Sequence, residues 1–274
     1  MGAFIGLVCF LLGGSEQWNG TPIPITISIT TFLLTCFMIP ALPNSFNEIR
    51  GNGELFPLNG PMWSLFFEYI GNILYAIFIR RLNTKRLTFL VVILGLLHSI
   101  FTIGNLSGYG SIGVGWTFDT INFFGGMLRM LFPFTLGMLI SHQFKAIKLP
   151  YPFLISAIIL LTTLSIPYLS PFKAINLNGI YEEICIAIIF PLIVIIGASS
   201  KENSKASQIL GEISYPLYII HYPIMYLFYQ WLIGTKQYTL QETYPLAIFI
   251  VILSIILAFT LSKLYDKPIR KRLR

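Results

Sequence analysis

Long, uninterrupted apolar segments constrain this chain more than any other feature of its sequence. The clearest runs cover residues 87–103, 153–166, 184–196 and 247–261. With their flanks they approach the roughly 20 residues that a helix needs to cross about 30 Å of hydrocarbon. Only 11% of the 274 residues are charged, against about 25% in an average soluble domain. The chain therefore lacks the charge needed to coat a soluble globule of this size.

The apolar runs are continuous rather than alternating, which favours helices over the strands of a barrel. Because lipid offers the backbone no hydrogen-bonding partner, helices or a closed barrel are the only spanning structures. The sequence predicts an all-α, polytopic transmembrane helical bundle with eight or nine spans. The expected spans are residues 2–14, 24–40, 61–80, 87–104, 121–141, 152–168, 181–198, 212–233 and 244–264. No internal repeat or long linker appears, so residues 1–274 are expected to form a single domain.

Lysine and arginine are concentrated in alternate loops of this arrangement. Most of the 18 basic residues fall into four groups. These are Arg80, Arg81, Lys85 and Arg86; Lys145 and Lys148; Lys201 and Lys205; and Lys263, Lys267, Arg270, Lys271, Arg272 and Arg274. By the positive-inside rule, the C-terminus is predicted to be cytoplasmic and the loop 104–118 external, in a multi-pass protein of the plasma (inner) membrane. The formal charge of +7 is expected to meet anionic lipid headgroups rather than nucleic acid.

A polar stripe is expected along the helix that begins near residue 61. Ser64, Glu68 and Asn72 are four residues apart and share one helix face, and Trp63 suits the membrane interface. An ionised acid at mid-bilayer costs about 2.5–3.5 kcal/mol on insertion scales, so Glu68 is expected to face the bundle interior and to have a partner. The stripe is either part of a functional site or a hydrogen-bonded network that holds helices together.

Arg129 is the only basic residue deep inside an expected span. It needs a counter-charge, for which Glu68 is the expected protein partner, or an anionic ligand carrying a phosphate or carboxylate. A purely structural Glu68–Arg129 ion pair is the alternative.

A third polar cluster lies near the start of the eighth expected span. Ser214, Tyr218, His221 and Tyr222 share a helix face there, and two nearby prolines free backbone carbonyl groups at membrane depth. His221 is either part of a site or simply a hydrogen-bonded residue of a helix wall.

The other polar residues of the spans are expected to have structural roles. Glu182, Glu183 and Glu212 lie near helix starts, where a carboxylate complements the helix dipole. His98 and His142 have no polar neighbours on their own helices, so neither is assigned to a site.

No nucleophile elbow, phosphate-binding loop, dinucleotide fingerprint or metal-ligand spacing appears. Cys9, Cys36 and Cys185 lie in apolar stretches, which argues against a disulfide framework and against a metal site. From the residues alone, the chain is a membrane bundle with a buried Glu/Arg/His site, which suits an enzyme or a transporter.

Three blocks of sequence, in order, resemble the acyltransferase-3 family of polytopic membrane O-acyltransferases. They are residues 57–68, 129–138 and 210–221, and the closing segment 265–271 matches the family's ending as well. The most specific patterns are Trp63-Ser-Leu-x-x-Glu68 and Ser214-Tyr-x-x-Tyr218-x-x-His221. The resemblance covers essentially the whole chain.

This resemblance implies transfer of an acyl group, usually acetyl from acetyl-CoA, to a hydroxyl of a cell-surface glycan, a lipid-linked sugar or a related metabolite. Acetyl-CoA or another acyl-CoA is then a co-substrate, with no tightly bound cofactor, no metal and no nucleic acid partner. The residues that it places in or around the site are Trp63, Ser64, Glu68, Arg129, Tyr215 and His221.

The chain departs from the family at its beginning. Family members start with additional helices, the first of which carries an arginine and, further along, the histidine regarded as the catalytic base. This chain enters apolar sequence at Met1, without the basic segment of a signal peptide, so we expect an N-terminally incomplete acyltransferase. His221 belongs to a different motif and is not assigned as the base. Because a general base contributes typically 10²–10⁴-fold, the chain alone is expected to be nearly inert.

Two other readings stay open. A transporter or flippase-like bundle would use the buried charges for a substrate pathway, although no paired half-length helices or repeat symmetry support it. A nonfunctional gene fragment would share the ancestry of the acyltransferases.

Overall fold

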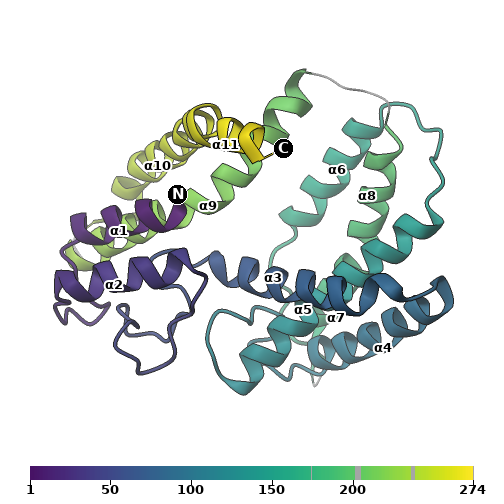
Figure 1. Cartoon of the computed structure of the whole chain (residues 1–274), viewed down its shortest axis with the longest axis horizontal. Coiled ribbons are helices and arrows are strands. Elements are labelled where there is room, and N and C mark those ends of the chain that lie inside the picture. The colour runs from purple at the N-terminus through teal and green to yellow at the C-terminus, as the bar shows by residue number, and fades with distance from the viewer. Residues whose placement is uncertain (174, 201–204, 236–237, 274) are drawn as a thin grey trace. The chain divides into compact units, whose positions relative to one another are not determined.

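The computed structural model describes residues 1–173, 175–200, 205–235 and 238–273. Within these ranges the chain is built of helices, and its extended pairings are isolated bridges rather than strands. The helices are α1 (Gly2–Leu12), α2 (Ile25–Cys36), α3 (Met62–Ile77), α4 (Thr84–Ile103), α5 (Thr120–Gln143), α6 (Pro152–Ser165), α7 (Leu177–Ile184), α8 (Phe190–Ala198), α9 (Lys205–Thr235), α10 (Leu240–Leu261) and α11 (Lys267–Leu273) (Figure 1). The predicted all-α membrane class is confirmed. Lys201 and Arg274, which belong to the basic groups of the predicted loops, lie outside the described residues.

The predicted number of spans was too high. Among the described residues, five helical segments are long and apolar enough to cross a membrane: Met62–Arg81, Thr84–Ile103, Thr120–Gln143, Leu177–Ala198 and Gln241–Arg272. The apolar helices α1, α2 and α6 have only 11, 12 and 14 residues. At about 1.5 Å per residue they fall short of the roughly 30 Å of hydrocarbon. Apolar sequence runs past the ends of these helices into loops, which the hydropathy pattern alone does not show.

Internal contacts divide the chain into two compact units. Unit 1 comprises Met1–Trp63, Trp116–Phe118 and Asn203–Arg274, and unit 2 comprises Ser64–Gly115 and Asp119–Glu202. Each unit is assembled from stretches that are distant in sequence, and the single-domain interpretation stays a prediction.

In unit 1, α9 packs against α1 and α10, and α1 packs against α2 (Figure 1). The loop between α2 and α3 covers α1, and Phe10, Ile49 and Leu58 form a core with no exposed surface. This loop is held by backbone hydrogen bonds, among them Leu55 N to the Trp116 carbonyl at 2.8 Å and Ala41 N to the Leu55 carbonyl at 2.7 Å. The loop is therefore a built part of the unit, because its buried backbone groups are paired.

In unit 2, α4 packs against α5 and α7, and α6 packs against α8. Side-chain caps fix where helices begin. Asn83 accepts a hydrogen bond from Arg86 N at the start of α4, and Asn176 accepts one from Gly179 N at the start of α7. Such caps satisfy donors that the first helical turn leaves without a partner.

Candidate functional site

The polar stripe of α3 lies on an exposed side of that helix. Ser64 is half-buried, as is Trp63, whereas Glu68 and Asn72 are exposed. The Asn72 amide donates to the backbone carbonyl of Glu68 at 2.9 Å. This differs from the expectation that Glu68 faces a packed interior.

Helix packing explains the difference. The face of α3 that meets α5 carries Phe67 and Gly71, and α5 presents Gly126 and Met130 to them. Glu68 follows Phe67 by one residue, which is about 100° further around the helix. Glu68 therefore lies beside the α3–α5 contact rather than in it, and its side chain is exposed.

Arg129 is half-buried on α5, and its Nη1 donates to the carbonyl of Val114 at 3.1 Å. Asn122, which lies nearer the start of α5, accepts a hydrogen bond from Gly115 N at 2.9 Å. Together they anchor the loop before α5. The expected Glu68–Arg129 ion pair stays a prediction.

His221 lies on α9, and its orientation assigns its protons. Nδ1 is 3.0 Å from the Leu217 carbonyl and 2.9 Å from the Tyr218 carbonyl. Because a carbonyl oxygen only accepts, Nδ1 carries the proton, and the neutral ring keeps a lone pair on Nε2. The sequence alone does not give this tautomer, which makes Nε2 the acceptor of the ring.

The neighbours of His221 in the same motif are more exposed. Tyr218 donates to the Pro61 carbonyl at 3.2 Å, and Ser214 donates to the Gly211 carbonyl at 2.9 Å. The exposed ring of Tyr215 lies 5.9 Å from the guanidinium of Arg270. Tyr218 thus ties α9 to the residue that precedes α3, and Ser214 stays within its own helix.

The largest fully buried side chain among the described residues is a charged one in unit 1, which the sequence analysis did not assign to a site. Arg50 is 1% exposed. Its guanidinium carbon lies 4.7 Å from the ring centroids of Phe10 and Trp18, and 4.8 Å from that of Tyr226. Its Nε donates to the Pro57 carbonyl at 3.1 Å, and its Nη1 has no hydrogen-bond partner among the described residues. Three aromatic faces therefore hold the cation.

Glu54 lies next to this cation and is 8% exposed. Its carboxylate accepts hydrogen bonds from the Tyr226 hydroxyl and from the Asn52 amide, both at 2.7 Å. Burial raises the pKa of Glu54, and the two hydrogen bonds and the charge of Arg50 oppose that rise. Burial likewise lowers the pKa of Arg50, against the opposing influence of Glu54. The two groups reduce each other's cost of burial.

A cavity of about 480 Å³ opens beside this pair. It is lined by Trp18, Asn52, Glu54, Tyr222, Met225, Tyr226 and Tyr229. The ring centroids of His221 and Tyr222 are 5.3 Å apart, so the cavity begins one residue beyond the His221 motif. Aromatic walls with a few polar groups are typical of sites for small ligands.

The chain brings these lining residues together from three distant segments. Trp18 follows α1, Asn52 and Glu54 precede α3, and the three tyrosines lie on α9. Only Tyr222 was assigned to a polar helix face from the sequence. The available signal was a pair of charges, Arg50 and Glu54, in a loop between apolar helices; their aromatic partners are too distant in sequence to be found by spacing.

His98 belongs to a second buried pair, so the expectation that it has no polar neighbour was wrong. His98 Nδ1 lies 2.6 Å from Glu183 Oε2, and the Ser99 hydroxyl donates to Glu183 Oε1 at 2.7 Å. Glu182 accepts from Ile112 N at 2.7 Å. Both acids therefore connect α7 to other segments of unit 2. They lie near the end of α7 rather than in its first turn, and Glu212 lies beyond the first turn of α9, so the expected helix-start position is wrong for all three acids. The partners are on different helices, which same-helix periodicity does not detect.

The sequence profile of a family described as an acyltransferase domain, known as acyltransferase-3, matches residues 1–263 of the 274. No curated protein and no solved structure matches the chain.

Proposed function

The chain belongs to the acyltransferase-3 family, and from that premise we propose which acyl group this membrane acyltransferase moves and where it goes. The proposed reaction transfers acetyl from acetyl-CoA to a hydroxyl of a cell-surface glycan or lipid-linked sugar. The acceptor hydroxyl oxygen attacks the thioester carbonyl carbon, the carbon–sulfur bond breaks, and CoA leaves as the thiol with the hydroxyl proton. The proposed location is the plasma membrane, with the C-terminus in the cytoplasm.

The observation that carries the proposal is the aromatic cavity of unit 1. A pyranose ring has apolar faces, which pack on aromatic rings, and a rim of hydroxyls, which need hydrogen-bond partners. Tyr222, Tyr226, Tyr229 and Trp18 supply the rings, and Glu54 supplies acceptors. Each carboxylate oxygen of Glu54 accepts one recorded bond and has a second lone pair to offer.

His221 is proposed to orient the acceptor rather than to be the base. Its Nε2 lone pair accepts a hydrogen bond from a hydroxyl or a water beside Tyr222, because Nδ1 is occupied by the carbonyls of Leu217 and Tyr218. Loss of the hydrogen bond to His221 Nε2 is therefore expected to lower the affinity for the acceptor more than the affinity for the acyl-CoA thioester.

The test uses membranes from source cells with and without the gene for this chain, incubated with acetyl-CoA labelled in its acetyl group. Because the gene is expressed in its own cells, the test does not require that the isolated chain, which is expected to be nearly inert, is active by itself. Label is expected in base-labile esters of a glycan fraction, and only when the gene is present. Tyr229→Ala removes one cavity wall and is expected to lower the labelling about tenfold, a loss of roughly 1.4 kcal/mol of transition-state stabilisation. Tyr244→Ala removes an exposed tyrosine of α10 that does not line the cavity and serves as the matched control. Equal labelling with and without the gene would contradict the proposal.

A further inference from the structure

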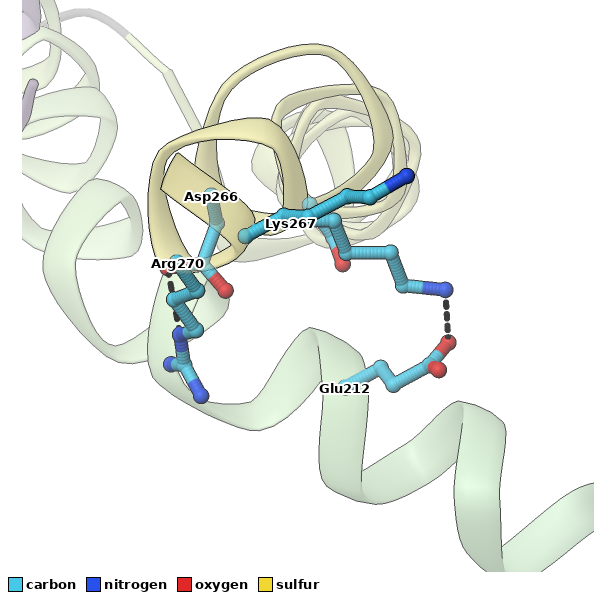
Figure 2. A pocket seen from close by; sticks show the side chains of 6 residues that line it. Glu212, Asp266, Lys267 and Arg270 are labelled. Carbon is cyan, nitrogen blue, oxygen red and sulfur yellow. Dashed lines mark hydrogen bonds and ion pairs between the residues drawn. The ribbon is translucent and has the colours of Figure 1, made fainter. Parts of the chain in front are cut away.

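A second pocket of unit 1 lies where α10 passes into α11. It has a volume of about 440 Å³ and is open at one side. A π-helical turn, Ser262–Asp266, joins the two helices, and α9 forms the opposite wall (Figure 2). The lining residues are Glu212, Ser262, Asp266, Lys267, Arg270 and Lys271. Single π-helical turns are frequent at functional sites.

Charges in this pocket are only partly matched. Lys267 Nζ lies 2.7 Å from Glu212 Oε2, and Arg270 Nε lies 3.0 Å from Asp266 Oδ1, as the dashed lines of Figure 2 show. Lys271 makes no ion pair with a described residue, and Arg270 uses only Nε in its pair. The pocket thus holds three cations against two acids, with the outer nitrogens of Arg270 and the ammonium of Lys271 available as donors.

We propose that this pocket binds a phosphate group through Arg270 and Lys271. The planar guanidinium presents two nitrogens in a fork that matches two phosphate oxygens, and a lysine beside it adds a point charge. The two acids hold the cations in place, since each fixes one basic side chain of α11 on the pocket rim. Exposed ion pairs of this kind are weak by themselves, so the paired lysine can also turn toward an anion.

Two sources of phosphate fit this chemistry. One is the phosphate groups of CoA, and this source rests on the proposed function. The other is a phospholipid headgroup, which does not. Both agree with the predicted cytoplasmic position of the C-terminal basic segment, where CoA thioesters and anionic headgroups meet the membrane surface.

For the CoA source, the geometry of α9 gives the site a functional meaning. Glu212 of this pocket and Tyr226 of the aromatic cavity lie on the same helix. Their separation along a straight helix is roughly 21 Å at 1.5 Å per residue. The two pockets are therefore at different levels of α9, as expected when the phosphate end of an extended donor and the acceptor sugar bind apart.

The experiment measures binding rather than turnover. The purified full chain is placed in nanodiscs of phosphatidylcholine, and CoA binding is measured by calorimetry. In the second arm, bound lipid is identified by native mass spectrometry from mixed micelles of phosphatidylglycerol and phosphatidylcholine. The double variant Arg270→Gln, Lys271→Gln is expected to lower the affinity for the phosphate-bearing probe at least about tenfold, because charged hydrogen bonds are lost. Arg272→Gln removes the same charge from α11 outside the pocket lining and is expected to change binding less than about twofold.

A second variant is expected to change phosphate binding in the opposite direction. Asp266→Asn removes an acid from the pocket and releases Arg270 Nε, so phosphate binding should become severalfold tighter, whereas a purely structural role of Asp266 would make it weaker. Loss of CoA binding alone in the double variant assigns the donor, and loss of phosphatidylglycerol alone assigns the lipid. Equal loss in Arg272→Gln, or no binding of either probe, overturns the proposal. CoA binding by the purified chain, together with no gene-dependent labelling in membranes, would instead count against the proposed function only.

Discussion

At the scale of single residues, unit 1 stabilises the buried charge of Arg50 with no direct ion pair to another described residue. Arg50 rests on the faces of Phe10, Trp18 and Tyr226, and Glu54 is held by the donors of Tyr226 and Asn52. Tyr226 serves both groups, with its ring under the cation and its hydroxyl on the acid. Removing one member therefore changes the surroundings of the others, as is expected for a buried polar network.

Glu54 should make the stability of the chain depend on pH. Its pKa in the folded chain is raised above the ordinary value of 4.5. The folded chain then holds the carboxyl proton more tightly than the unfolded chain does. This contribution to stability is fully present below pH 4.5 and is lost as the pH rises through the folded pKa.

The comparison that measures this effect is wild type against Glu54→Gln, by thermal unfolding in detergent from about pH 4 to pH 8. The wild-type melting temperature is expected to fall relative to that of the variant as the pH rises. The scale is about 2–4 °C for each kcal/mol in a chain of this size class. Parallel curves over the whole range would show that the carboxyl does not titrate differently in the folded chain.

At the scale of helices, two kinds of contact hold unit 2 together. One is polar and links α4 to α7 through His98 and Glu183. The other is steric, between α3 and α5, where glycines permit close approach. A Cβ added at Gly126 would lie 2.6 Å from a ring atom of Phe67, and one added at Gly71 would lie 2.5 Å from the sulfur of Met130. Small residues at helix contacts are typical of membrane bundles.

Energetic coupling is expected between His98 and Glu183. Their side chains are 0% and 11% exposed, and loss of either leaves the other a buried polar group with a missing partner. In a double-mutant cycle of His98→Gln and Glu183→Gln, the interaction energy should be about 1–3 kcal/mol, measured by unfolding in detergent. His142→Gln, at an exposed position of α5, should change stability by less than about 0.5 kcal/mol. Strict additivity would mean that the pair does not stabilise the α4–α7 contact.

Two glycines of α5 offer a matched test of the steric contact. Gly126→Ala is expected to cost about 1–3 kcal/mol, because the new methyl group overlaps the ring of Phe67 and forces it to move. Gly137→Ala has nothing within 4 Å of its added methyl and should be neutral or stabilising by up to about 1 kcal/mol, since alanine favours the helix. Equal effects at both positions would contradict the close α3–α5 packing.

How far the sequence predicts this molecule depends on the range of the interaction. Apolar runs predicted the helices, because each helix satisfies its backbone locally. The polar residues of single helix faces, such as Ser64, Glu68 and Asn72, could be grouped. The side of the helix that packs was set by close contacts at Gly71 on the same helix and at Gly126 on its neighbour. His98 with Glu183 and Arg50 with Tyr226 join segments far apart in sequence, so no periodicity could reveal them.

At the scale of the whole chain, α6 decides the membrane topology. The basic residues Lys145 and Lys148 follow α5, and the loop that contains Lys173 separates α6 from α7. If α6 crosses the bilayer, these loops lie on opposite sides, as the alternation of basic loops predicts. Yet α6 has 14 residues, or about 21 Å of helix, against roughly 30 Å of hydrocarbon. A crossing therefore requires that apolar residues flanking α6, such as Leu149 and Ile166, also lie in lipid or that the bilayer thins locally.

Reporter fusions resolve this choice. Fusions after residues 84 and 147 are expected to report the cytoplasm, and fusions after residues 110 and 170 the exterior, because Lys and Arg are retained on the cytoplasmic side. The fusion after residue 110 serves as the control, since it follows the long helices α3 and α4 and does not contain α6. A cytoplasmic signal after both 147 and 170 would show that α6 lies at the surface and returns to the same side. The helices after α6, and with them the pocket beside α11, would then lie in the orientation opposite to the one that the positive-inside rule predicts. The predicted orientation would be restored only if α9 also fails to cross the bilayer.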